Sequence, residues 1–89
     1  MKKYLFANIG GSDRAAVADD ESGKISIIHK ANGLWFFNEL ILSKEINPVT
    51  QRSAFDGYCD RFQEISQSQF QSFLSGYTNY LNGLLWQPW

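Results

Sequence analysis

Charged residues are missing from the last part of the chain. They stop at Glu64, and residues 65–89 contain no Asp, Glu, Lys or Arg. The same stretch has the apolar spacing of one helix, and a helix on the surface of a soluble protein normally carries charged residues on its exposed side. We therefore expect this segment to be covered on more than one side.

Residues that build catalytic and metal sites are also scarce. The chain has one cysteine and one histidine, so an internal disulfide is excluded, and the single thiol fits a reducing compartment, which predicts a cytoplasmic protein. His29 lies on a predicted strand on the side of Ile25 and Ile27, and Cys59 lies among apolar residues of a predicted helix. Neither has partners at the spacing that a nucleophilic triad or a metal site needs. The sequence predicts no catalytic residue, no metal or other cofactor, and no enzyme activity.

The charge pattern argues against two classes of partner. The net charge is −1 and both signs are mixed, whereas nucleic-acid binding needs a clustered excess of Lys and Arg. No apolar run reaches the length of about 18 residues that a membrane span needs. The apolar residues near the N-terminus are soon interrupted by Asn8 and the Gly10-Gly11 pair, unlike a secretory signal. We predict that the chain binds neither nucleic acid nor membrane.

Aromatic residues, in contrast, are plentiful. Three Trp, four Tyr and seven Phe occur in 89 residues, and each ring can bury about 150–250 Å². Such a core is large enough for an independent domain without a metal or disulfides. We find no linker, repeat or low-complexity tract, so residues 1–89 are interpreted as a single domain.

The first third of the chain is typical of an antiparallel meander. Residues 3–9 and 15–18 are short apolar runs, and Gly10-Gly11 separates them. Residues 19–23 are a polar turn that contains a glycine, and residues 24–30 alternate as a half-buried strand does. Three strands are therefore predicted in this region.

Residues 31–46 fit two structures. Asn32-Gly33 is the strongest short signal for a hairpin and predicts a fourth strand from Leu34. The spacing of Phe37 and Leu40, together with several residues that favour helices, suits a helix that ends before Asn47-Pro48. We favour the helix and keep the strand as the alternative.

The second half of the chain is predicted to be helical. Phe55, Tyr58, Cys59 and Phe62 have the spacing of one helical face, and Ser53 is a plausible N-cap for it. A second helix is predicted from Ser66, where Ser66 and Gln69 match the capping-box pattern, to Pro88. Its apolar stripe consists of Phe70, Phe73, Leu74, Tyr77, Leu81, Leu84 and Leu85.

Together these elements predict an α+β fold. The N-terminal part forms an antiparallel meander of three or four strands, and two or three C-terminal helices pack on it in two layers. The helix favoured within residues 31–46 would be the first of three, followed by the helix between Ser53 and Phe62 and the uncharged helix after Ser66; without it, two helices remain.

Two acidic clusters are candidate partner-binding sites. Asp56, Asp60 and Glu64 are spaced four residues apart, so on one helix they would form a row about one turn apart. Asp19-Asp20-Glu21 lies in the predicted turn and lacks the spacing of a calcium loop. Both clusters fit ordinary solvated surface, and both could also attract a basic partner.

Small residues follow one side of the uncharged helix, and we call Ser72, Gly76, Asn79 and Gly83 the small-residue seam. A glycine within a helix costs about 1 kcal/mol relative to alanine, so a close approach of another backbone is expected there. That backbone could belong to the same chain, to a second copy or to another protein.

Trp86 and Trp89 place two indoles near the end of the chain. They could anchor a partner, because tryptophan is enriched at binding hot spots. They could equally close the end of a small core.

These features predict a small, non-catalytic protein that binds another protein. In size and surface such a chain is similar to the small bacterial immunity proteins. This resemblance implies an antitoxin that neutralises a cognate toxin by occluding its active site, with a basic toxin domain as the candidate partner. The alternatives are a phage-encoded inhibitor such as an anti-CRISPR protein, or a structural homodimer built on the small-residue seam. The residues predicted to bind the partner are Asp19, Asp20, Glu21, Asp56, Asp60, Glu64, Trp86 and Trp89.

Overall fold

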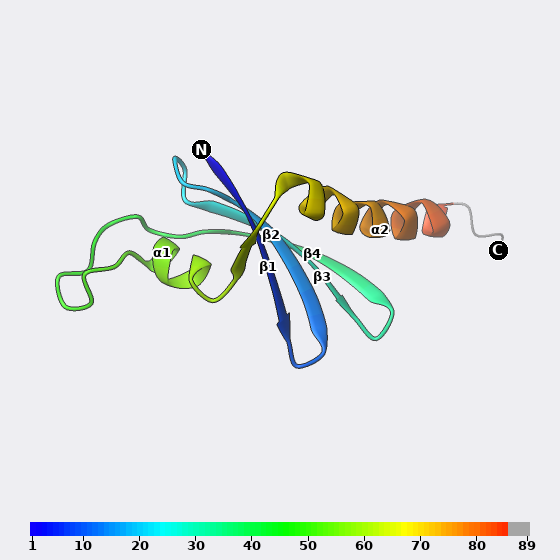
Figure 1. Ribbon diagram of the computed structural model, residues 1–89, viewed down its shortest axis with the longest axis horizontal. Helices are drawn as coiled ribbons and strands as arrows, with labels where there is room; N and C mark the ends of the chain where they lie inside the picture. Colours follow the sequence, from blue (N-terminus) through cyan, green and yellow to red (C-terminus); the bar gives the residue numbers. More distant parts are fainter. Residues whose placement is uncertain (86–89) are drawn as a thin grey trace.

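A computed structural model of the chain describes residues 1–85 (Figure 1). It confirms an α+β fold with an N-terminal meander: a five-stranded antiparallel sheet in the order β4-β3-β2-β1-β5 and one long helix. Because consecutive strands of the meander are neighbours, only β5 joins the sheet from a distant part of the chain. The elements are β1 (Lys2–Ile9), β2 (Ser12–Asp19), β3 (Lys24–Ala31), β4 (Leu34–Ile41), α1 (Ala54–Cys59), β5 (Gln63–Ile65) and α2 (Gln67–Leu85).

The helix favoured for residues 31–46 is wrong, and the alternative strand is present. Asn32 and Gly33 both have positive φ, 54° and 77°, which is the geometry of the two-residue turn that matches the twist of flanking strands. From this turn β4 pairs with β3 continuously, from Leu34 opposite Ala31 to Ile41 opposite Lys24. The turn and a full ladder of cross-strand pairs outweigh the weak helix preference of the segment.

The two helices lie on opposite faces of the sheet, so the prediction of two layers is wrong. Leu5, Ile25 and Ile27 pack against α1 on one face. Ile28 and its neighbours pack against α2 on the other. Since β3 buries apolar residues on both of its faces, a layer is required on each side. Figure 1 shows α1 and α2 on either side of the strands.

Helix α1 starts where it was predicted but is shorter. The Ser53 side chain accepts a hydrogen bond from the Asp56 backbone N–H at 3.0 Å, which confirms the N-cap. The helix ends at Cys59, and the chain turns into β5, which pairs with β1. The described chain therefore has one long helix and this single short one, rather than two or three full helices.

Helix α2 begins with the predicted capping box and is covered on one side only. Gln69 Oε1 accepts a hydrogen bond from the Ser66 backbone N–H at 2.9 Å, and Ser66 Oγ accepts one from the Gln69 N–H at 3.1 Å. Within residues 1–85, however, Leu74, Leu81 and Leu84 are 37%, 40% and 49% exposed. The expectation that this uncharged segment is covered on more than one side is thus wrong for the single chain. Among the described residues no helix has both the length and the apolar character to cross a membrane.

Candidate functional site

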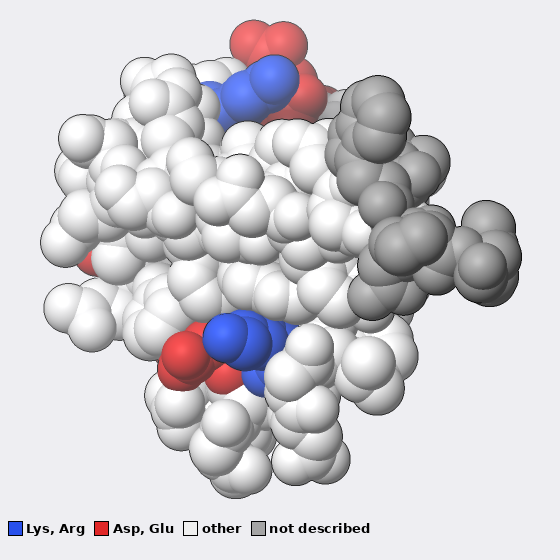
Figure 2. Space-filling view, turned by 90° about the vertical axis from the view of Figure 1, so that its right-hand side faces the viewer, with Lys and Arg blue, Asp and Glu red and all other residues white. Residues whose placement is uncertain are grey.

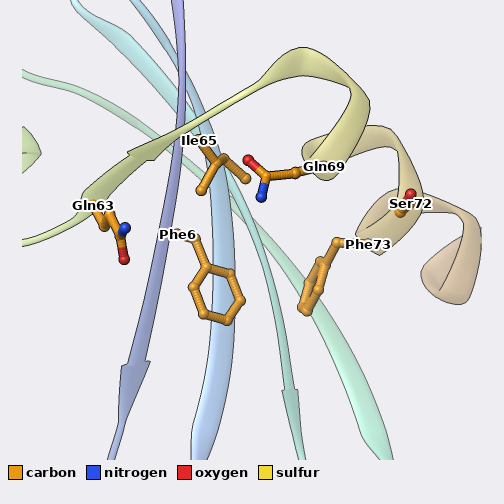
Figure 3. A pocket seen from close by; sticks show the side chains of 6 residues that line it. All are labelled: Phe6, Gln63, Ile65, Gln69, Ser72 and Phe73. Carbon is orange, nitrogen blue, oxygen red and sulfur yellow. The ribbon is translucent and has the colours of Figure 1, made fainter.

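A groove lies between the N-terminal part of α2 and the neighbouring strands β1 and β5 (Figure 3). Its volume is about 520 Å³. The capping box starts α2 directly after β5, and this short connection sets the two elements side by side. The groove is lined by Phe6, Gln63, Ile65, Gln69, Ser72 and Phe73.

The chemistry of the groove is apolar and neutral. The Phe6 and Phe73 rings meet edge to face, with their centroids 5.9 Å apart. Gln63 and Gln69 add amide groups, and Ser72 adds a hydroxyl. No ionisable side chain is among the six lining residues, so proton transfer has no donor or acceptor of suitable pKa there. The groove can hold an apolar side chain and hydrogen-bond to neutral polar groups.

The acidic turn is held by local contacts. Asp20 pairs with the N-terminal ammonium at 2.7 Å, and this hydrogen bond lowers the pKa of its carboxyl. Asp19 accepts a hydrogen bond from the Glu21 backbone N–H at 3.0 Å, which lowers the pKa of Asp19. Glu21 also lies 3.6 Å from the ammonium. Part of the negative charge of this turn is therefore balanced within the chain.

The predicted row of acidic residues on one helix is wrong. Asp56 lies in the first turn of α1, Asp60 is the C-cap, and Glu64 lies on β5, because the helix stops before a third turn. Asp60 also forms an ion pair with Arg52. The three carboxylates therefore do not form a single row along one helix. Their role in partner binding stays a prediction.

The small-residue seam is explained within the chain at one position. A Cβ at Gly76 would lie 3.0 and 3.1 Å from two carbons of the Trp35 indole, so Gly76 leaves room for that ring. Ser72 lines the groove, Asn79 is exposed, and Gly83 faces open space within the described part of the chain. The approaching group is thus a side chain of β4 and not another backbone.

Alanine substitutions at the two seam glycines should have different effects on the free energy of unfolding. Gly83→Ala is expected to raise the free energy of unfolding by about 0.5–1 kcal/mol, because alanine favours the helix and meets nothing. Gly76→Ala should give no gain or a loss, since Trp35 must move. Chemical denaturation of both variants measures the difference. Equal stabilisation by both substitutions would contradict the contact with Trp35.

The remaining candidate residues do not form a reactive site. His29 stacks on Phe36 with ring centroids 4.8 Å apart. Cys59 is buried in the α1 core, and desolvation raises the pKa of its thiol, which fits a structural role. No group of residues that could hold a metal ion occurs among residues 1–85. Trp86 and Trp89 lie outside the described residues.

A second surface consists of the β4 edge and the outer part of α2; the sequence indicated the uncharged helix but not the strand edge beside it. Seen from the right-hand side of Figure 1, the molecule has a broad uncharged band across its middle, with visible charges above it, below it and at its left margin (Figure 2). Trp35 was passed over because residues 31–46 were interpreted as a helix. The Asn32-Gly33 signal could have identified it as part of an edge strand. The exposed apolar residues of these elements are Leu34, Phe36, Phe37 and Ile41 on β4, and Leu74, Leu81 and Leu84 on α2.

No protein-family model matches the chain, and comparisons with curated proteins and with solved structures gave no match. Similarity therefore assigns no family or activity. The groove and the uncharged surface are the features from which function can be inferred.

Proposed function

We propose that the chain is a non-catalytic protein-binding protein that takes an extended, mainly apolar segment of its partner into the groove between β5 and α2. The observation that carries this proposal is the lining of the groove, which combines two aromatic rings with neutral amides and no ionisable group. Such a lining suits side chains and backbone of a peptide. The six lining residues include no general acid or base that could activate the Ser72 hydroxyl.

The position of β5 supports binding of an extended segment. Among the described residues β5 pairs with β1 on one side only, so its other edge has unpaired backbone groups. Gln63 lies opposite Phe6, and Ile65 lies opposite Tyr4, which places both on the α2 face of the sheet. A strand added to β5 would therefore direct alternate side chains toward the groove.

Toxin neutralisation is the specific form of this proposal. The partner would be a basic toxin domain, and the bound chain would occlude its active site. Asp56 and Glu64 have no ion pair among residues 1–85, so they can contribute to attraction of a basic partner. Complementary charge would act mainly on the rate of association, while the groove would supply the apolar contact.

Filling the groove should weaken binding. The probe is a displayed library of random peptides selected against the immobilised protein, and we expect enrichment of peptides with alternating apolar residues. Ser72 is exposed and lines the groove, so Ser72→Trp should lower affinity for the selected peptides by at least about tenfold. Ser75→Trp is the matched control, because Ser75 is also exposed on α2 but does not line this groove.

Two results would contradict the proposal. One is a selection that enriches no peptide, and the other is a set of peptides that bind wild type and Ser72→Trp equally. The toxin hypothesis has its own test, in which the chain is co-expressed with the protein encoded by the adjacent gene. Rescue of growth by wild type, lost in Ser72→Trp and kept in Ser75→Trp, would support it; absence of toxicity or of rescue would refute it.

A further inference from the structure

The edge strand β4 lacks the features by which proteins normally protect an exposed sheet edge. Within residues 1–85, β4 is paired only with β3, over eight residues and without a bulge. It contains no proline and one charged residue, Glu39, whose carboxylate pairs with Lys24 of the same chain at 2.7 Å. Edges are commonly protected by short length, prolines, bulges or several charges. The edge of β4 is therefore open to pairing with another strand.

The end of α2 extends past this same edge. Phe70 packs against Tyr4 of β1 at 5.3 Å, whereas Tyr77 packs against Trp35 of β4 at 5.8 Å, both between ring centroids. The helix thus crosses the sheet from β1 to β4. Residues 78–85, which we call the overhang, continue for about 12 Å, and Figure 1 shows α2 extending beyond the strands. Leu81 and Leu84 on the overhang are exposed.

We propose that a second copy of the chain pairs with the open β4 edge and lies beneath the overhang. The two β4 strands would pair antiparallel around a two-fold axis at Asn38. A two-residue hairpin closes on a hydrogen-bonded pair, here Ala31 and Leu34, and the pair types then alternate along the strands. This alternation directs the backbone N–H and C=O groups of Trp35, Phe37, Glu39 and Ile41 away from β3.

With the two-fold axis at Asn38, every outward-pointing backbone N–H and C=O group of β4 meets a partner on the other copy. This register sets Trp35 opposite Ile41 of the partner subunit, and Phe37 opposite Glu39 of the partner subunit. Two bonds per pair give about eight backbone hydrogen bonds across the interface, within the usual range of about five to fifteen. The two copies of Glu39 do not face each other, so no like charges are opposed. The β4 edge is thus complementary to itself.

The same register gives the overhang a surface to cover. Helix α2 crosses β4 at Trp35, on the face of the sheet that also carries Ile41. In the paired sheet the overhang would therefore continue over Ile41 of the partner subunit, which is 76% exposed in the single chain. No charged group of the helix has to be desolvated, because residues 65–89 contain none. The lack of charge on α2 then has a physical reason that the single chain does not provide.

Sedimentation equilibrium tests the dimer. Wild type is expected to sediment as a dimer, and Ile41→Lys should weaken the dimer at least about tenfold, because it places a charge beneath the partner's overhang. Val49→Lys, at an exposed loop position, is the matched control and should leave association unchanged. Circular dichroism confirms that each variant is folded. A monomeric wild type at millimolar concentration, or a dimer unaffected by Ile41→Lys, would overturn the proposal.

Cross-linking tests the register. Residues on the axis form a pair whose side chains are close enough for a disulfide, so Asn38→Cys should give a covalent dimer under mild oxidation. Gln71→Cys, which is exposed on α2, and wild type, whose Cys59 is buried, should not. Failure of Asn38→Cys to exceed these controls would overturn the pairing at Asn38.

The dimer and the groove can be tested separately, because β4 and β5 are the two opposite edges of the sheet. Ile41→Lys should leave peptide binding intact, and Ser72→Trp should leave the dimer intact. Loss of one property therefore says nothing against the other.

Discussion

Replacing Phe55 with alanine is expected to lower the free energy of unfolding by about 3–5 kcal/mol. Phe55 is 1% exposed and is among the largest fully buried side chains. It packs with Leu5 and Ile25 in the core beneath α1. A domain of this length is stabilised by only about 5–13 kcal/mol in total, so the substitution should remove a large part of its stability.

Urea denaturation of Phe55→Ala measures the loss, and Val49→Ala is its control. Val49 is almost fully exposed, so its truncation should change stability by less than about 0.5 kcal/mol. Because Phe55 also fixes the chain after β4, with its backbone N–H donating to the Ser43 carbonyl at 3.1 Å, the loop should exchange amide protons faster in the variant. A loss below about 1 kcal/mol would contradict the packing of α1 on the sheet.

Replacing Gly23 with alanine is expected to cost about 2–5 kcal/mol for two separate reasons. Gly23 has a φ of 77°, which costs an L-residue about 1–2 kcal/mol. An added Cβ would also collide with the Leu42 carbonyl oxygen, which belongs to backbone and cannot simply rotate away. Gly23 further donates a hydrogen bond to Asp19 and accepts one from Leu42, so its displacement would disturb both connections.

Gly33→Ala separates the cost of the positive φ from the cost of the collision with Leu42. Gly33 has the same φ of 77°, but a Cβ there meets nothing within 4 Å. It should therefore show only the backbone cost of about 1–2 kcal/mol. Thermal and urea denaturation of both variants, measured together, give the difference. If the two losses are equal, the close approach of Leu42 to Gly23 is refuted.

The sequence was informative wherever a local signal had no competitor. The turns at Gly10-Gly11 and at residues 19–23, the Ser53 cap and the Ser66–Gln69 capping box were predicted, because each depends on contacts within a few residues. Residues 34–41 were misread because their apolar residues fit both periodicities, and pairing with β3 decided between them. Strand β5 is only three residues long and exists through its pairing with β1, so no periodicity could reveal it.

The surfaces were harder to predict than the elements. The groove requires β5 and α2 to lie beside β1, a contact between the two ends of the chain that a single sequence does not encode locally. The predicted acidic row failed for a related reason, since it assumed that α1 continues to Glu64. The absence of charge after Glu64 did indicate an unusual surface, but not that Trp35 and the β4 edge would share it.

The pairing of β1 with both β2 and β5 also has a consequence for the order of folding. The four meander strands are joined by tight turns, and their pairing involves residues close in sequence, so they can form quickly. β5 must close a loop that contains residues 7–62, and this has a larger entropic cost. During synthesis on the ribosome, the meander would therefore leave the exit tunnel with the β5 side of β1 vacant. The sheet would be completed, and α2 docked, only once residues 63–85 have emerged as well.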